Sequence, residues 1–134
     1  MHAAVLQCQI AKANDMRKAR QHNYWAMADA LSKIKGVHIP LAYPGAECNP
    51  FGFAFTVDSQ PMRDYLAGAL RAASMDCRPV VGGSVQQHPY WRRKDITATP
   101  NADHIHHCGI MVGVPPYPTV AMIETLKNVV ERVL

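Results

Sequence analysis

The sequence predicts an α+β fold: a small, mostly antiparallel sheet with helices packed on one face, and a long N-terminal helix. Apolar residues recur with helical or strand spacing in the order helix, strand, strand, helix, strand, strand, helix. The strands are few and short and the helical stretches are amphipathic, which is typical of helices layered on a small sheet. The 134 residues fit one domain, 1–134, with a long helical segment at 1–36 and the α+β part at 37–134.

The composition favours a globular protein in a reducing compartment. Apolar residues make up 49% of the chain, enough for a packed core, and the formal charge is +4. The cations are scattered except at residues 92–94, so the charge balance permits contact with phosphates, and a nucleic-acid partner is not expected. No apolar run reaches membrane-spanning length, and the N-terminus does not have the pattern of a signal peptide. The cysteines are far apart and predict reduced thiols, mostly buried, in a cytoplasmic protein: Cys8, Cys48, Cys77 and Cys108.

The first predicted element is a helix over residues 3–35, where apolar side chains return every three or four positions and Gly36 provides a stop. Asn14 and Asp15 are suited to a kink or a second helix start. A single small domain cannot cover so long an apolar stripe. We therefore expect its first turns to pack on a second copy of the chain, giving a homo-oligomer. The apolar residues concerned are Val5, Leu6 and Ile10.

Two strands are expected next. Residues 37–42 predict a short edge strand, because Pro40 cannot donate a ladder hydrogen bond. Residues 51–57 alternate large and small side chains, with Phe51, Phe53 and Phe55 on one face. We interpret this as a strand with a buried aromatic face rather than as a stacking platform for bases.

The remaining helices and strands are predicted from the residues that begin and end helices. Ser59 or Gln60 is expected to cap a helix with Pro61 in its first turn, followed by a strand over residues 77–81. Residues 101–108 predict a short helical turn stopped by Gly109, then a strand at 110–114. Thr119 is expected to cap the last helix. The predicted buried stripes of the two longer helices are Met62, Tyr65, Leu66, Ala69, Leu70 and Ala73 in one, and Ile123, Leu126, Val130 and Val133 in the other.

The loop of residues 82–94 is the strongest candidate for a binding site. A β-branched run ends at Gly82 and Gly83, and a polar turn then brings an imidazole, two aromatic rings and three cations close together in sequence. This pattern is typical of a scaffold that presents side chains to a ligand. A solvated basic loop is the structural alternative.

Other constellations favour structural interpretations. His104, His106, His107 and Cys108 offer at most half of a zinc site, so no metal site is predicted. A Cys–His nucleophile built from Cys77 or Cys108 with His88 lacks a nucleophile elbow and an oxyanion loop, so core thiols are expected. The paired glycines lack the GK[ST] ending of a phosphate loop.

Several stretches, in this order and spacing, carry a family resemblance over nearly the whole chain. They are Ala3-Ala4, Leu6-Gln7, Arg20 and Asn23; Phe51-Gly52-Phe53; Arg63, Leu66 and Leu70; Arg78-Pro79, Gly83-Ser84 and Pro89-Tyr90; and Asn101-Ala102-Asp103, Gly109 and Val112-Gly113-Val114. Together they resemble the C-terminal small domain of the DegT/StrS-type nucleotide-sugar aminotransferases and sugar 3-dehydratases. These are pyridoxal phosphate (PLP) enzymes of the aspartate-aminotransferase fold, some of them in lipopolysaccharide biosynthesis.

This resemblance implies what the chain contributes to an enzyme. In the family, the large domain holds the PLP phosphate cup, the Asp on the pyridine nitrogen and the Schiff-base Lys, or a His in the dehydratase branch. We therefore expect a stand-alone or truncated small domain that binds no cofactor and is inactive by itself. Ser84 stands where the family often has Asn, His88 near its usual Gln, and Ser74-Met75 in place of Gly-Ile. These departures bear on the substrate more than on the fold.

The predicted substrate-binding residues all lie in the 82–94 loop. His88 is expected to offer a hydrogen bond or a proton, Tyr90 a packing wall, and Arg92 or Arg93 an anion contact. The full set is Gly83, Ser84, His88, Tyr90, Arg92 and Arg93. No residue is assigned a catalytic role. The alternative hypothesis is an autonomous module that presents the same loop to a nucleotide, an anionic ligand or a protein partner.

Overall fold

The computed structural model describes residues 2–40, 43, 45, 48–91 and 99–134. The helices are α1 (His2–Ile10), α2 (Ala13–Ser32), α3 (Gln60–Ala72), α4 (Pro100–Cys108) and α5 (Val120–Val133), with a 3₁₀ turn η1 (Val85–Gln87). The strands are β1 (Val37–His38), β2 (Gly52–Val57), β3 (Cys77–Arg78) and β4 (Gly109–Gly113). The predicted α+β class with an antiparallel sheet is confirmed.

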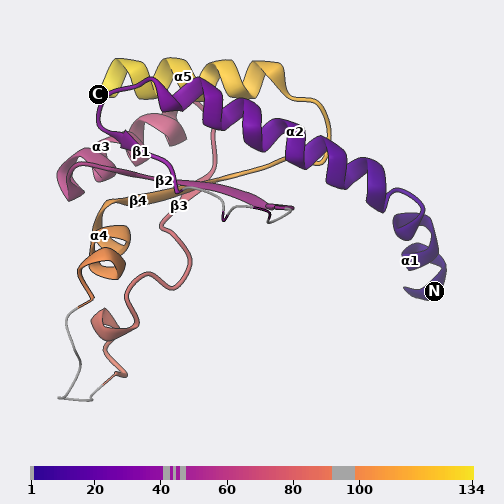
Figure 1. Ribbon diagram of the computed structural model, residues 1–134, viewed down its shortest axis with the longest axis horizontal. Helices are drawn as coiled ribbons and strands as arrows, with labels where there is room; N and C mark the ends of the chain where they lie inside the picture. The colour runs from indigo at the N-terminus through magenta and orange to yellow at the C-terminus, as the bar shows by residue number, and fades with distance from the viewer. Residues whose placement is uncertain (1, 41–42, 44, 46–47, 92–98) are drawn as a thin grey trace.

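The sheet has the order β1-β2-β4-β3, and every neighbouring pair is antiparallel. Its centre is the β2–β4 pair, in which Phe53 faces Val112 and Phe55 faces Ile110. Because strand side chains alternate between faces, Phe53, Phe55 and Val57 all point to the same side. That side is covered by α2, α3 and α5, which lie together on one face of the sheet (Figure 1).

The core fills the space between the sheet and these three helices. Its fully buried side chains come from α2, β2, α3, β4 and α5, and the largest are Phe53, Phe55, Met27, Leu31, Leu66, Leu70, Ile110 and Leu126. The rings of Phe53 and Tyr24 meet edge to face with centroids 5.3 Å apart, a favoured aromatic geometry. The predicted stripes of α3 and α5 are confirmed at Leu66, Leu70, Leu126 and Val130, whereas Tyr65 is exposed.

Three predicted elements differ in extent from the structure. The strands expected at 37–42 and 77–81 each end after two residues, close to Pro40 and Pro79, which have no N–H for the ladder. Phe51 lies outside β2 and is exposed, so the aromatic face consists of Phe53 and Phe55 alone.

The long N-terminal helix is interrupted at Ala11 and Lys12, and α2 begins at Ala13. Asp15 lies in the first turn of α2, so the second start falls at Ala13, just before the Asn14–Asp15 pair. The helix ends at Ser32, four residues before Gly36. In Figure 1, α1 continues past the edge of the sheet. Among the helices of the described part, none is both long and apolar enough to cross a membrane.

Candidate functional site

Residues 82–91 of this loop follow β3 and, together with α4, occupy the side opposite α2 and α5 (Figure 1). Gly82 and Gly83 turn the chain with φ of 78° and 50°, values that favour glycine. The 3₁₀ turn η1 follows, and the backbone N–H of Trp91 donates to His88 O at 2.9 Å. The described part of the loop, residues 82–91, is therefore a series of hydrogen-bonded turns.

Contacts with α4 hold this loop in place. His106 Nδ1 accepts a hydrogen bond from the Ser84 backbone N–H at 3.3 Å. Further along, the Gln87 amide donates to Asp103 Oδ1 at 3.2 Å, and the Gln86 amide donates to Thr99 Oγ1 at 3.1 Å. Residues 84–87 of the loop are therefore held against α4 and its N-cap residue Thr99.

Asp103 is the electrostatic centre of this attachment. The Ser84 hydroxyl and then the Gln87 amide lower the pKa of Asp103, and the charges of His107 and His106 act in the same direction. The Ser84 hydroxyl oxygen is itself buried and has no partner in full hydrogen-bond geometry within the described residues. Asp103 is therefore held as a carboxylate that accepts from the loop.

The His88 ring is held by the backbone carbonyl of Gly82 and by the ring of Tyr90. Its Nε2 lies 2.7 Å from Gly82 O. The ring stacks on that of Tyr90, with centroids 5.3 Å apart and planes at 19°. Because a carbonyl only accepts, His88 Nε2 carries a proton and Nδ1 keeps a free lone pair. Tyr90 remains 72% exposed, so one side of this ring pair is open to a ligand.

The predicted site residues are thus partly located. Gly83, Ser84, His88 and Tyr90 lie in the described loop, whereas Arg92 and Arg93 lie outside the described residues. Their assignment to substrate binding stays a prediction. Two residues from other elements join them, because a surface cavity of about 220 Å³ is lined by Arg63 and His106 as well as by His88 and the paired glycines.

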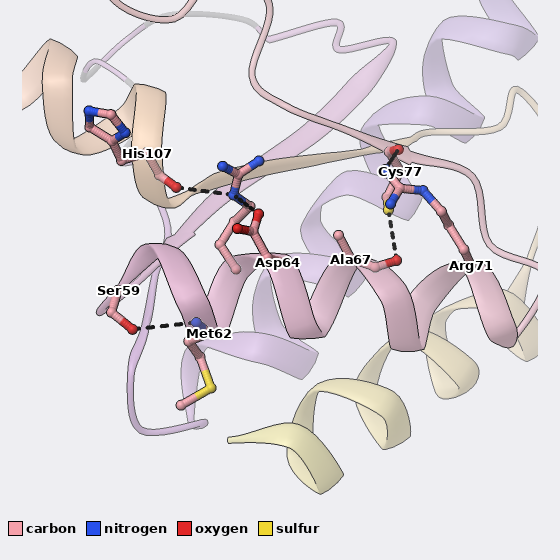
Figure 2. Close-up of polar contacts among 8 residues, drawn as sticks. Ser59, Met62, Asp64, Ala67, Arg71, Cys77 and His107 are labelled. Carbon is pink, nitrogen blue, oxygen red and sulfur yellow. Dashed lines mark hydrogen bonds and ion pairs between the residues drawn. The ribbon is translucent and has the colours of Figure 1, made fainter.

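Sequence reasoning did not assign Arg63 or His106 to the site. The available signal was weak: Asp103 and His106 are three residues apart, a spacing that places both on one face of a helix. Arg63 lies in the first turns of α3, and its contact with the C-terminal end of α4 is tertiary. Its Nε donates to His107 O at 3.0 Å (Figure 2).

The alternative site chemistries find no support in the described part of the chain. No group of three or more His, Cys, Asp and Glu residues there is placed to hold a metal ion; His104 instead contacts Thr56 Oγ1 at 3.3 Å. Cys77 and Cys108 are buried. Burial raises the pKa of the Cys77 thiol, whose Sγ donates to Ala67 O (Figure 2), so Cys77 is suited to the core rather than to nucleophilic attack.

The described residues do not fit a complete PLP site. PLP needs a group that fixes its ring, a cradle for its phosphate and a Schiff-base lysine or its replacement. Among the described residues, no lysine lines the cavity beside the loop. The lysines of the described part lie elsewhere, at Lys12, Lys18, Lys33, Lys35 and Lys127. No step through PLP can be assigned to this chain alone.

Known proteins match this chain over only part of their own length. A curated relative, the dTDP-4-dehydro-2,6-dideoxy-D-glucose 3-dehydratase of Saccharopolyspora spinosa, is 30% identical over 129 residues, which cover 92% of this chain and 28% of the relative. The chain thus spans less than a third of that protein.

Solved structures share the fold over a similar fraction. The E. coli GDP-4-keto-6-deoxy-D-mannose-3-dehydratase with bound hydrated PLP superposes with a TM-score of 0.75 at 23% identity, over 91% of this chain and 32% of that one. A 3-amino-5-hydroxybenzoic acid synthase reaches a TM-score of 0.83 at 16% identity, over 98% and 37%. The model of the DegT/DnrJ/EryC1/StrS aminotransferase family matches residues 1–134. The chain belongs to this family.

Proposed function

We propose that this chain supplies the small-domain part of a PLP-dependent enzyme that acts on nucleotide sugars, either an aminotransferase or a 3-dehydratase. The 30% identity to a sugar 3-dehydratase favours the dehydratase branch. PLP, when bound to a complete enzyme, supplies the electron sink for the chemistry. The residues of this chain bind and orient the sugar nucleotide, and the chain alone is catalytically silent.

The attachment of residues 82–91 to α4 is the observation that carries this proposal. Loops that bind substrates are most effective when rigid elements hold them, because less order is lost on binding. Here the loop is fixed by Ser84–His106 and Gln87–Asp103, and it presents the half-buried His88 and the exposed Tyr90. In the proposal, His88 gives a hydrogen bond or a proton to the sugar, and Tyr90 forms a wall.

The proposal extends to assembly and compartment. Val5, Leu6 and Ile10 of α1 are between 58% and 71% exposed, and we propose that they pack on a second copy of the chain. The four cysteines are all unpaired, which suits a reducing cytoplasm.

Two measurements on the purified chain test the function. Calorimetry with a GDP- or dTDP-linked 4-keto sugar should detect binding that weakens in the Tyr90→Ala variant. Incubation with PLP should give no Schiff-base absorbance band. A PLP band that the unmodified chain forms stoichiometrically would contradict catalytic silence. Binding of single-stranded nucleic acid or any nucleotide with equal affinity would favour the autonomous module instead.

A further inference from the structure

The cavity between residues 79–88, α3 and α4 is unusually rich in cationic and protonatable groups. Its volume is about 220 Å³, and Arg63, His88 and His106 meet there. The rest of its lining is Pro79, Val80, Gly82 and Gly83, so no carboxylate of the described chain lines it. Such a lining suits an anion.

Arg63 is the fixed charge of this cavity. Its side chain is 17% exposed, and its Nε donates to His107 O at 3.0 Å and lies 3.1 Å from Asp64 Oδ1. These contacts use one edge of the guanidinium. Within the described residues its two terminal nitrogens have no hydrogen-bond partner, although each carries two donors. A held guanidinium with its terminal donors free is suited to a phosphate or carboxylate.

The two imidazoles have complementary protonation states. His106 Nδ1 accepts from Ser84 N–H, so Nε2 carries the proton and is a donor. His88 donates from Nε2 to Gly82 O, so Nδ1 can gain a proton while that bond stays intact. Protonating His106 at Nδ1 would instead break its bond to the loop. His88 is therefore the ring that can become cationic without rearrangement.

The charged groups around His88 permit this change. The ring of His106 on α4 lies 6.2 Å from it, Arg63 on α3 lines the same cavity, and Tyr90 stacks on its face. Asp103 on α4 acts on His106 and His107, and Asp64 pairs with Arg63. An anion placed between Arg63 and His88 would offset the repulsion between their charges.

We propose that Arg63, His88 and His106 form an anion subsite for a single phosphoryl group. The source is either the nucleotide part of a sugar-nucleotide substrate or free inorganic phosphate, and only the first rests on the proposed function. Arg63 donates from its terminal nitrogens and His106 donates from Nε2–H, and the His88 ring lines the same cavity.

The experiment follows the imidazole NMR signals of the 134-residue chain during titration with inorganic phosphate and, separately, with GDP. Signals are assigned with H88N and H106N. Saturable shifts are expected at His88 and His106. His38 on β1, which pairs with Asp58 just after β2, does not line the cavity and should not respond.

Two arginine variants test the site. R63Q should weaken phosphate binding about tenfold, the loss expected for a charged hydrogen bond. R71Q is the matched control, because Arg71 is on the same helix and also donates to a backbone carbonyl, Cys77 O at 3.4 Å (Figure 2), but does not line the cavity. If R63Q does not fold, H88N leaves α3 intact and should also weaken phosphate binding.

The outcomes separate the inference from the proposed function. Equal weakening in R63Q and R71Q, shifts at all histidines alike, or no saturation with either probe would overturn the subsite. Phosphate and GDP binding through Arg63 would support both ideas. Binding of phosphate with no response to GDP would support the subsite and would count against a nucleotide at the loop.

Discussion

Gly83 is the residue at which loop and helix come closest. Its φ is 50°, and a Cβ there would collide with His106 Nδ1, whereas a Cβ at Gly82, with φ of 78°, would meet nothing within 4 Å. In both G82A and G83A, left-handed backbone strain should lower the free energy of unfolding by about 1–2 kcal/mol. G83A should lose more and should also shift the His106 NMR signal. Urea denaturation and that signal measure the difference; equal effects would show that the close approach is unimportant.

The Asp103 carboxylate gives the loop attachment a defined pH dependence. Its pKa is lowered below the ordinary 3.8, first by the Ser84 hydroxyl and then by Gln87. A depressed folded-state pKa adds stability above the unfolded-state pKa, and that stability is lost as the pH falls through the folded-state value. Wild type should therefore exceed D103N in stability near neutrality, with the gap closing below about pH 4.

Denaturation curves at several pH values measure this gap. The control repeats the comparison in the Q87A background, which removes one donor to Asp103. The stability difference between Q87A and Q87A/D103N should then be smaller than that between wild type and D103N. A gap between wild type and D103N that stays constant from neutral to acid pH would contradict the assignment.

At the scale of elements, α3 depends on its N-terminal cap. The Ser59 Oγ accepts from Met62 N–H at 3.4 Å (Figure 2), which satisfies one of the free donors at the helix start. The S59A substitution should lower the free energy of unfolding by about 1 kcal/mol. S32A is a matched control, because the Ser32 hydroxyl at the end of α2 only donates to Asp29 O. Thermal melting compares the two, and equal losses would argue against the cap.

The elements also show what periodicity can and cannot predict. It located β2, α3, β4 and α5, because each buries a regular face. Periodicity did not show the break between α1 and α2, because Ala11 and Lys12 are good helix formers and neither is a glycine or proline. Only the Asn14–Asp15 pair indicated a second helix start, which falls one residue earlier, at Ala13. Periodicity made two strands too long, because β-branched residues beside Pro40 and Pro79 look extended even where the ladder cannot continue.

The candidate site was predictable only along one stretch of chain. The paired glycines and the sequence HPYW marked the loop that contains His88 and Tyr90. Arg63 and His106 could not be joined to it, since their approach depends on how α3 and α4 pack against the sheet. A sequence pattern identifies which loop can bind; tertiary contacts decide which other side chains reach the ligand.

For the whole molecule, α1 is the part that the domain leaves uncovered. It continues past the sheet edge (Figure 1), and Val5, Leu6 and Ile10 face solvent. Apolar groups of this size each gain about 1.5–3 kcal/mol when they are buried. If they pack on a second copy, replacing Leu6 and Ile10 by lysine should weaken self-association well over tenfold.

Sedimentation velocity over a range of concentrations measures this association. V120K is the matched control, because Val120 is 68% exposed at the start of α5, away from α1, and its substitution adds the same kind of charge. Wild type and V120K should associate alike, while the L6K/I10K variant sediments as a monomer. Lysine favours helix, so α1 itself should persist in circular dichroism. A wild-type protein that remains monomeric at high concentration, or a V120K variant that dissociates equally, would show that α1 does not join two copies.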